Sequence, residues 1–362
     1  MKAIIKTEKL KDLLAKAVKG ASNNKLLPIT GFVRIAINDG VIRLATTDMV
    51  SHLYLKDTVE SGDTFKVVVG IEKFSKLISK MTCENIELEK VEDKAFSYLK
   101  VTGNGTYKIE IPLDENGNEV EFPAIQYTVG DKAQIKKSVI DLILATCKPS
   151  LAKTLEVPVY TNYYVGSNVL ATDTMQIAAI NVELVKDKKM LISSNLMDLL
   201  SVLDKELVDV QFDASGKIVD FSTDDVRIIS RVENGIEDYA VDAINQLVAQ
   251  EFESSCKFNK LSMANTLERI ALFVGPYDDR AVSLTFTENG INVASKEVTG
   301  FETIAYVEDT NYKSFTCMIN IDMLLAQLKA SSADIIEMQY GAENGIKLVD
   351  GAVTQVIALL EA

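Results

Sequence analysis

Residue types on which much enzyme chemistry depends are scarce in this chain of 362 residues. It has a single histidine, His52, which excludes a histidine-based catalytic triad and a metal site built from two histidines. Its four cysteines are scattered and form no C-x-x-C pair, which predicts reduced, buried thiols rather than a disulfide framework. The sequence contains no glycine-rich phosphate loop either. We therefore expect no catalytic residues, no cofactor and no metal site.

Long apolar runs are missing as well. Charged residues interrupt every apolar stretch well before the roughly 20 residues that a membrane span needs. Residues 1–6 contain no apolar core followed by a cleavage site of small residues, so they do not have the pattern of a secretory leader. These absences predict a soluble, cytoplasmic protein that contacts no membrane.

The chain is acidic on balance. Its formal net charge is −14, and a surface of that sign repels the phosphates of nucleic acid. The net charge does not say where the charges lie, however, so their distribution along the chain decides whether a basic surface exists.

Six amphipathic segments recur at nearly even intervals along the chain. Neighbouring segments begin about 60 residues apart, and each pair of segments recurs after about 126 residues, which is typical of an internal repeat. The segments cover residues 9–19, 71–81, 135–147, 195–203, 261–273 and 321–329. The spacing predicts three copies of one unit, each of which is itself a doubled half-unit.

The stretches between these helices have the pattern of antiparallel hairpins. Phe32–Ile37, for example, is followed by the turn residues Asn38-Asp39-Gly40 and by a second β-branched run. The expected fold class is therefore α+β, in which each half-unit covers one face of an antiparallel sheet with a helix. The expected domains are residues 1–125, 126–249 and 250–362, joined by short connections.

A short marker repeats in register with the helices. Leu44-Ala45-Thr46-Thr47-Asp48 recurs as Leu170-Ala171-Thr172-Asp173, and Gly290–Ser295 is a more diverged third copy. Neither aspartate has a base or a set of metal ligands beside it in the sequence. A role in capping a turn explains both carboxylates.

These features together resemble the bacterial-type DNA polymerase III β sliding clamp, the processivity factor of a replicative polymerase. Lys25-Leu26-Leu27-Pro28-Ile29 and Leu44–Asp48 are similar to the opening R-P-x-L-P-I and L-x-x-T-D patterns of that family. Val169–Ala178 resembles its V-A-T-D-G-H-R-L-A segment, and Glu237-Asp238-Tyr239 resembles its P-D-Y. No single motif is specific, but their order and spacing extend over the whole chain.

The resemblance implies three copies of the DNA-clamp domain in each chain and a head-to-tail homodimer. Its domains would close a ring around double-stranded DNA, with helices inside and sheets outside, and would bind DNA by topology rather than by sequence. The implied partners are a replicative DNA polymerase, a clamp loader and a second copy of the chain. The implied location is the cytoplasm of a bacterial cell or of a phage-infected host.

Basic residues gather on four of the six helical segments. Residues 8–25, 71–81, 135–153 and 257–273 each carry more lysine and arginine than acid, whereas the fourth and sixth segments do not. Lysine suits the loose phosphate contacts of a protein that slides. The alternative is that these lysines only keep exposed helix faces in water. The residues predicted to face DNA are Lys9, Lys16, Lys19, Lys25, Lys73, Lys76, Lys80, Lys137, Lys148, Lys153, Lys260 and Arg269.

Two further sites follow from the resemblance alone. A pocket for partner peptides is implied at Thr172, Met175, Gln176, Ile177, Ile244, Leu359 and Leu360. Apolar contacts that close the ring are implied at Tyr107, Ile109, Leu272 and Phe273, with ordinary core packing as the alternative. The chain departs from the family at the pocket, because Thr174-Met175-Gln176 replaces Gly-His-Arg and Ala358–Ala362 replaces M-P-M-R-L. A different motif preference, as in a divergent or virus-encoded clamp, is therefore one hypothesis.

Two other classes of function stay open at this point. One is an enzyme that uses paired carboxylates, such as a nuclease or a glycosidase, although nothing in the spacing of the 52 acidic residues favours it. The other is a scaffold or inhibitor that keeps the clamp fold and does not encircle DNA.

Overall fold

The computed structural model describes residues 1–92, 97–275, 279–307, 312–342 and 344–361. Within them the fold is α+β, and the strands pair antiparallel throughout, as the sequence predicts. The helices are α1 (Thr7–Lys19), α2 (Ile71–Ser79), α3 (Lys137–Cys147), α4 (Ser194–Leu200), α5 (Val241–Ala249), α6 (Lys260–Ile270) and α7 (Ile321–Ala330). None of these helices is both long enough and apolar enough to cross a membrane.

The six helical segments expected from the sequence are present, and their repeat is confirmed. α5 was not expected, and the fifth segment leaves the α-helical conformation at Ile270 and continues as the 3₁₀ turn η5 (Ala271–Phe273). In α1 the residues Leu10, Leu13, Leu14 and Ala17 are buried, which is the apolar stripe of a surface helix. Burial of that stripe fixes which face of the helix meets the sheet.

The polar groups at helix ends show why the helices begin and stop where they do. The side chain of Asn259 accepts a hydrogen bond from the backbone N–H of Ser262 at the start of α6, and Asn320 caps α7 in the same way. Gly20 ends α1 where the chain meets Thr46 and Leu53, and a Cβ at Gly20 would lie 2.5 Å from Thr46 Oγ1. Only glycine fits this close approach of backbone to sheet.

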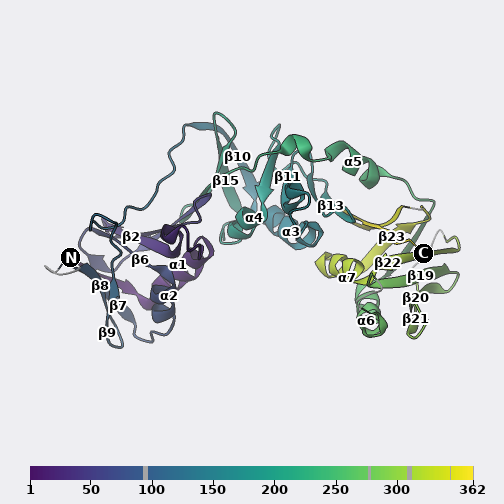
Figure 1. Cartoon of the computed structure of the whole chain (residues 1–362), viewed down its shortest axis with the longest axis horizontal. Helices are drawn as coiled ribbons and strands as arrows, with labels where there is room; N and C mark the ends of the chain where they lie inside the picture. Colours follow the sequence, from purple (N-terminus) through teal and green to yellow (C-terminus); the bar gives the residue numbers. More distant parts are fainter. Residues whose placement is uncertain (93–96, 276–278, 308–311, 343, 362) are drawn as a thin grey trace. The chain divides into compact units, whose positions relative to one another are not determined.

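The chain divides into two compact units. The first consists of residues 1–137 and 195–232, and the second of residues 138–194 and 233–362. In the first unit α1 and α2 pack as a neighbouring pair, and in the second α6 packs against α7 (Figure 1).

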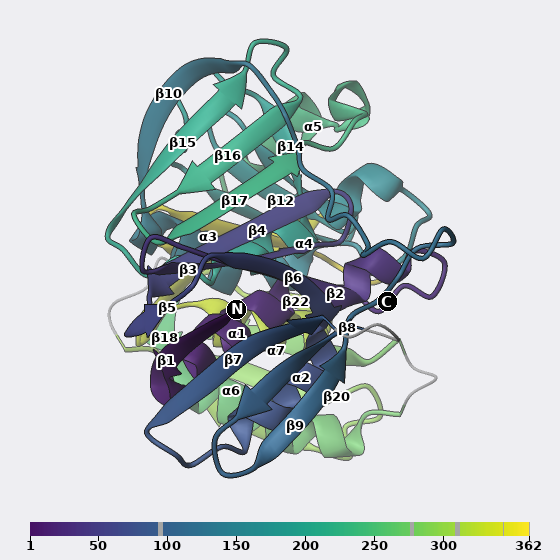
Figure 2. The same cartoon turned by 90° about the vertical axis from the view of Figure 1, so that its left-hand side faces the viewer.

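The described residues of the first unit form two sheets. The smaller has the order β5 (Ser61–Gly62), β1 (Lys2–Lys6), β7 (Asn85–Glu92), β8 (Ser97–Thr102) and β9 (Thr106–Glu110). The larger, whose strands are seen side by side in Figure 2, has the order β10 (Val129–Lys136), β15 (Leu207–Asp213), β16 (Ile218–Ser222), β17 (Val226–Arg231), β4 (Ser51–Thr58), β3 (Val41–Thr47), β2 (Phe32–Asn38) and β6 (Phe65–Gly70).

The second unit also contains an eight-stranded and a smaller sheet. The larger has the order β14 (Met190–Ser193), β11 (Asn162–Val165), β12 (Val169–Thr172), β13 (Gln176–Ile180), β25 (Val353–Ala358), β24 (Gly345–Asp350), β23 (Ile335–Tyr340) and β18 (Ser254–Asn259). The smaller has the order β21 (Phe301–Ile304), β20 (Gly290–Ser295), β19 (Ala281–Thr287) and β22 (Phe315–Asn320).

Both eight-stranded sheets cross a border between expected domains. β4 pairs with β17 in the first unit, and β13 pairs with β25 in the second. The three expected domains are therefore joined by strand pairing, and their borders at residues 125 and 249 stay a prediction.

The repeated marker forms the same turn twice, which confirms the capping role of its aspartates. Asp48 Oδ1 accepts hydrogen bonds from the N–H groups two and three residues later, at 2.9 and 2.6 Å. Asp173 Oδ1 does the same at 3.0 and 2.9 Å. In both turns the residue after the aspartate is left-handed, with φ of 77° at Met49 and 81° at Thr174. Both carboxylates are therefore engaged by the backbone.

Candidate functional surfaces

Several of the cations expected to face DNA already pair with acids of the same unit. Lys9 Nζ lies 3.3 Å from Asp57 Oδ1 in the neighbouring strand β4. Two further pairs of this kind are Lys76 with Glu72, at 2.6 Å, and Arg269 with Glu302, at 2.5 Å. Counting charges along the sequence overstated the basic character of these helices, because the acids that neutralise their lysines and arginine cannot be identified from the sequence.

Lys16 forms the most enclosed of these ion pairs. Its Nζ lies 3.0 Å from Asp12 and 3.1 Å from Asp204. Burial lowers the pKa of Lys16, but the hydrogen bonds to the two carboxylates outweigh burial, so the pKa is raised above its ordinary value. Asp204, which lies beyond the fourth helix and belongs to a segment that is not basic in the sequence, therefore helps to neutralise Lys16 near the end of α1.

Some of the other predicted DNA-facing residues have no acid partner among the described residues. Lys25, Lys73 and Lys80 are exposed and form no ion pair within the described ranges. Lys19 Nζ donates to Ser201 Oγ at 3.2 Å, and Lys260 Nζ donates to the backbone oxygen of Ser331 at 2.9 Å. Lys148 and Lys153 are exposed, and Lys137 is half-buried. Among the predicted DNA-facing residues of the first unit, those without an acid partner therefore lie mainly on or next to α2 and on the loop after α1.

The residues of the implied peptide pocket gather where β13 pairs with β25. Gln176 stands opposite Ile357, and the backbone oxygen of Met175 accepts a hydrogen bond from Ala358 N at 2.8 Å. Thr172, Gln176, Ile177 and Ile244 are buried, however. Of the seven predicted residues, only Met175, Leu359 and Leu360 keep accessible surface.

Gln176 has a structural role in this region. Its Nε2 donates to the backbone oxygen of Pro149 at 3.0 Å, and its Oε1 accepts from Gln327 Nε2 at 2.8 Å. Gln327 is fully buried and also donates to Ser150 Oγ at 2.6 Å. Nothing in the sequence signals this network, because its members lie far apart along the chain.

Unexpected apolar surface surrounds the buried part of the pocket. Ile177 and Ile244 belong to one apolar cluster with Tyr164, Leu170 and Tyr239. Half-buried side chains of α5 and of the segment before β11 pack against this cluster, namely Val159, Tyr160, Val241 and Val248. The unrecognised helix α5 thus supplies much of the apolar surface at this site. Its signal was an amphipathic pattern that falls outside the regular spacing of the other helices.

The first implied ring-closing site lies on β9, the edge strand of its sheet. Tyr107 is 40% exposed there, whereas Ile109 is only 3% exposed. Ile109 is therefore a core residue of its own unit and does not offer surface, which is a correction to its predicted role. β9 itself presents a free backbone edge.

The second implied ring-closing site is exposed throughout. Leu272 and Phe273 in η5 are 82% and 56% exposed, so the core alternative is wrong for them. Val298 and Phe301, which the sequence did not single out, are exposed as well, and the Phe273 ring lies close against Gly300. Phe301 begins β21, the edge strand of its sheet. Apolar side chains and a free strand edge thus occur at one place in the second unit.

The part of the chain that the structure describes holds no cluster of three or more His, Cys, Asp or Glu side chains suited to a metal ion. Burial raises the pKa of Cys147, Cys256 and Cys317 to about 12, so these thiols stay protonated and unreactive. Among the described residues, no arrangement of nucleophile, base and orienting group stands out.

Comparisons with known proteins match the fold and not the sequence. No family model and no curated protein matches this chain. The β subunit of a DNA polymerase from Streptococcus pyogenes is 18% identical, with a TM-score of 0.87 over 100% of both chains. The DNA polymerase sliding clamp of Bacillus subtilis is 19% identical, with a TM-score of 0.85 over 100% of this chain and 99% of that one. The β subunit of DNA polymerase III from Thermotoga maritima is 18% identical, with a TM-score of 0.82 over the same shares. From end to end, this chain therefore has the fold of bacterial DNA polymerase sliding clamps.

Proposed function

We propose that this chain is a DNA sliding clamp, which encircles double-stranded DNA and tethers a replicative DNA polymerase for processive synthesis. The observation that carries the proposal is the clamp fold over the full length of the chain, since a match confined to one unit would leave the rest unexplained. The protein acts without catalysing a reaction, takes no cofactor, and works in the cytoplasm of a bacterial cell or a phage-infected host. A clamp loader opens the ring and places it on DNA.

The ring is proposed to be a head-to-tail homodimer with three clamp domains in each chain, residues 1–125, 126–249 and 250–362. β9 of one copy would add to β21 of the other, which would satisfy the free backbone groups of both edges. Tyr107 would then meet the exposed apolar cluster of Leu272, Phe273 and Phe301. Burial of these side chains explains why an otherwise acidic surface leaves them in water in the single chain.

DNA contact is assigned to the free cations described above, foremost Lys25, Lys73 and Lys80. Electrostatic contacts of single lysines with phosphates carry no sequence information and allow a protein to slide along DNA. Partner peptides are assigned to the surface around Met175, α5 and the chain segment after β25. Methionine adapts its shape to different apolar partners, which suits a site that several proteins share.

The proposal is tested by retention on DNA after loading by a clamp loader. A ring stays on circular DNA and leaves linearised DNA through the free ends, so retention that is equal on both would refute encirclement.

The dimer is tested by light scattering during gel filtration, where the mass should be twice 39.8 kDa. Replacing Leu272 and Phe273 by Asp should yield the monomer. Leu261→Asp changes an exposed leucine of the same unit away from the edge strand, and it should leave the dimer intact.

A scaffold or inhibitor with the clamp fold that does not encircle DNA is the second candidate. The ion pairs of Lys9, Lys16, Lys76 and Arg269, which neutralise predicted DNA contacts, favour it. It predicts a monomer in gel filtration and no difference between circular and linear DNA.

A further inference from the structure

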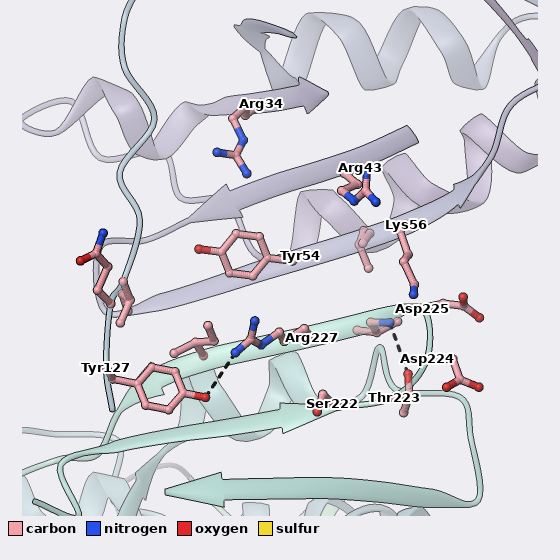
Figure 3. A pocket seen from close by; sticks show the side chains of 15 residues that line it. Arg34, Arg43, Tyr54, Lys56, Tyr127, Ser222, Thr223, Asp224, Asp225 and Arg227 are labelled. Atoms are coloured by element: carbon pink, nitrogen blue, oxygen red, sulfur yellow. Dashed lines mark hydrogen bonds between the residues drawn. The ribbon is translucent and has the colours of Figure 1, made fainter. Parts of the chain in front are cut away.

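A cavity of about 680 Å³ opens on the larger sheet of the first unit and is separate from every surface discussed so far (Figure 3). Its walls are β2, β3, β4, β17, the turn between β16 and β17, and residues 125–127, which run past the ends of these strands. The volume lies in the range of about 300 to 1,000 Å³ that is typical of sites for small ligands and short segments. None of the residues expected to bind DNA, partner peptides or a second copy lines it.

The register of the sheet explains why a hollow forms here. Arg34 on β2 stands opposite Ala45, which stands opposite Tyr54, which in turn stands opposite Arg227 on β17. Residues paired in this way point to the same face of a sheet. Ala45 is small, so the row leaves a gap between Arg34 and Tyr54. Arg43 and Lys56 form a cross-strand pair in the next row.

Arginine is rare in this chain and concentrated at this cavity. The sequence has six arginines, and Arg34, Arg43 and Arg227 line this one cavity. Arg227 is engaged, because its Nε donates to the buried carboxylate of Asp220 at 2.9 Å and its Nη2 to the hydroxyl of Tyr127 at 3.3 Å. This network holds Tyr127, and with it the wall formed by residues 125–127, in place.

Arg34 and Arg43 are not engaged in this way. Neither of them forms an ion pair with any residue that the structure describes. Arg34 Nε is buried without a hydrogen-bond partner among those residues, and its guanidinium lies 5.7 Å from the centre of the Phe122 ring. A buried donor without a partner is costly, so an acceptor from outside the chain would be bound favourably at Arg34.

The charges of the cavity define the ligand further. Arg34, Arg43 and Lys56 are cationic and lack carboxylate partners, whereas Asp225 lies 4.0 Å from Lys205 outside the cavity. Asp224, on the same side of the site as Asp225 in Figure 3, is the remaining acid on the wall. The net positive charge of the cavity is small. One or two carboxylates would neutralise it, whereas a polyphosphate would bring more negative charge than the cavity can neutralise. Tyr54 and the buried side chain of Ile229 add an apolar surface that a bare phosphate would not use.

From these observations we infer that this cavity binds a short acidic peptide segment of a partner protein, in which an apolar side chain adjoins a carboxylate. Arg34 and Arg43 would hold the carboxylate, because a planar guanidinium group can donate two parallel hydrogen bonds to a carboxylate. The apolar side chain would lie over Tyr54. This inference does not depend on the proposed sliding function, because it uses none of the same residues.

The test is a titration of the full-length protein with the peptide Ac-Gly-Glu-Phe-Asp-Gly-amide, carrying a fluorescent label and followed by anisotropy. Arg43→Gln and Arg34→Gln should each weaken binding about tenfold or more, because each removes a charge-assisted hydrogen bond. Arg43 is exposed and unpaired, so its replacement leaves the fold intact even if Arg34→Gln does not. Arg231→Gln, the same substitution at the far end of β17 and outside the cavity, should bind the peptide like the unmodified protein.

Three outcomes would overturn the inference. The first is an absence of binding, or binding that Arg43→Gln leaves unchanged. The second is equal binding of the peptide in which Gln and Asn replace the acids. The third is displacement of the peptide by inorganic phosphate or by a short DNA duplex that itself binds in an Arg43-dependent way, which would assign the cavity to a phosphate ligand.

Discussion

The buried amide of Gln327 offers a sharp test of how the second unit is held together. Its Nε2 donates to Gln176 Oε1 and to Ser150 Oγ, and its own Oε1 has no partner within the described part of the chain. Gln327→Ala removes both hydrogen bonds, which leaves Gln176 Oε1 unpaired at a cost of about 1 to 3 kcal/mol. Truncating a fully buried side chain adds a cavity, so the total loss is about 3 to 5 kcal/mol.

Gln327→Met separates the polar part of this loss from the packing part. Methionine has a similar length and fills the same space, and, like alanine, it removes the unpaired Oε1 of Gln327. We therefore expect a loss of only about 1 kcal/mol, since the relief of one unpaired group offsets the loss at Gln176. The difference between the two variants, about 2 to 4 kcal/mol, reports the cavity.

Differential scanning calorimetry measures these losses. For a unit of this size, each 1 kcal/mol lowers Tm by about 2 to 4 °C, so Gln327→Ala should shift one transition by about 10 °C and Gln327→Met by a few degrees. Gln339→Ala, in the half-buried part of β23, should change Tm by less than about 2 °C. Equal shifts for the Ala and Met variants, or no shift for either, would refute the reasoning.

The remaining predictions concern backbone strain, thiol reactivity, pH and charge. Thr174→Gly should raise Tm by about 1 to 2 °C, because a β-branched residue at a φ of 81° is strained; an unchanged or lower Tm would show that the turn is relaxed. A thiol reagent should label Cys83 rapidly in the folded protein and leave the three buried cysteines unmodified until unfolding, as mass spectrometry of the labelled peptides can check. Burial lowers the pKa of His52 below 6.5, so the unfolded state binds more protons, and the free energy of unfolding should fall as the pH drops through 6.5; His52→Phe should flatten that part of a urea-unfolding profile, and an unchanged slope would contradict it. Asp204→Asn should remove one of the two carboxylates that pair with Lys16 and make DNA retention more resistant to salt, whereas Asp224→Asn should not affect it.

The sequence predicted most of the fold because its signals are local. The apolar stripe of α1 and the Asn38-Asp39-Gly40 turn can be recognised from neighbouring residues alone. Repetition of the same patterns after a fixed interval then supported each assignment. α5 was not predicted because it lies outside the regular spacing of the other helices and buries only Ile244 fully, so its apolar stripe is weak.

The candidate sites were predicted less well because they depend on pairs that are distant in the sequence. Lys16 and Asp204 are 188 residues apart, and no local pattern reveals that they meet. The burial of Ile109 could not be predicted from the local sequence either. Tyr107 and Ile109 are two residues apart on β9 and therefore project from the same face of the strand. The sequence did not show that this face is covered at Ile109 and open at Tyr107.

The pairing of β4 with β17 and of β13 with β25 has a consequence for how the protein can be dissected. A fragment that ends at residue 125 would lose β17 and leave β4 as a bare edge, and a fragment that begins at residue 250 would leave β25 bare. Long uncovered edges of this kind recruit other strands and promote aggregation. The repeat is therefore a unit of sequence but not of autonomous folding, and soluble truncations should keep each eight-stranded sheet whole.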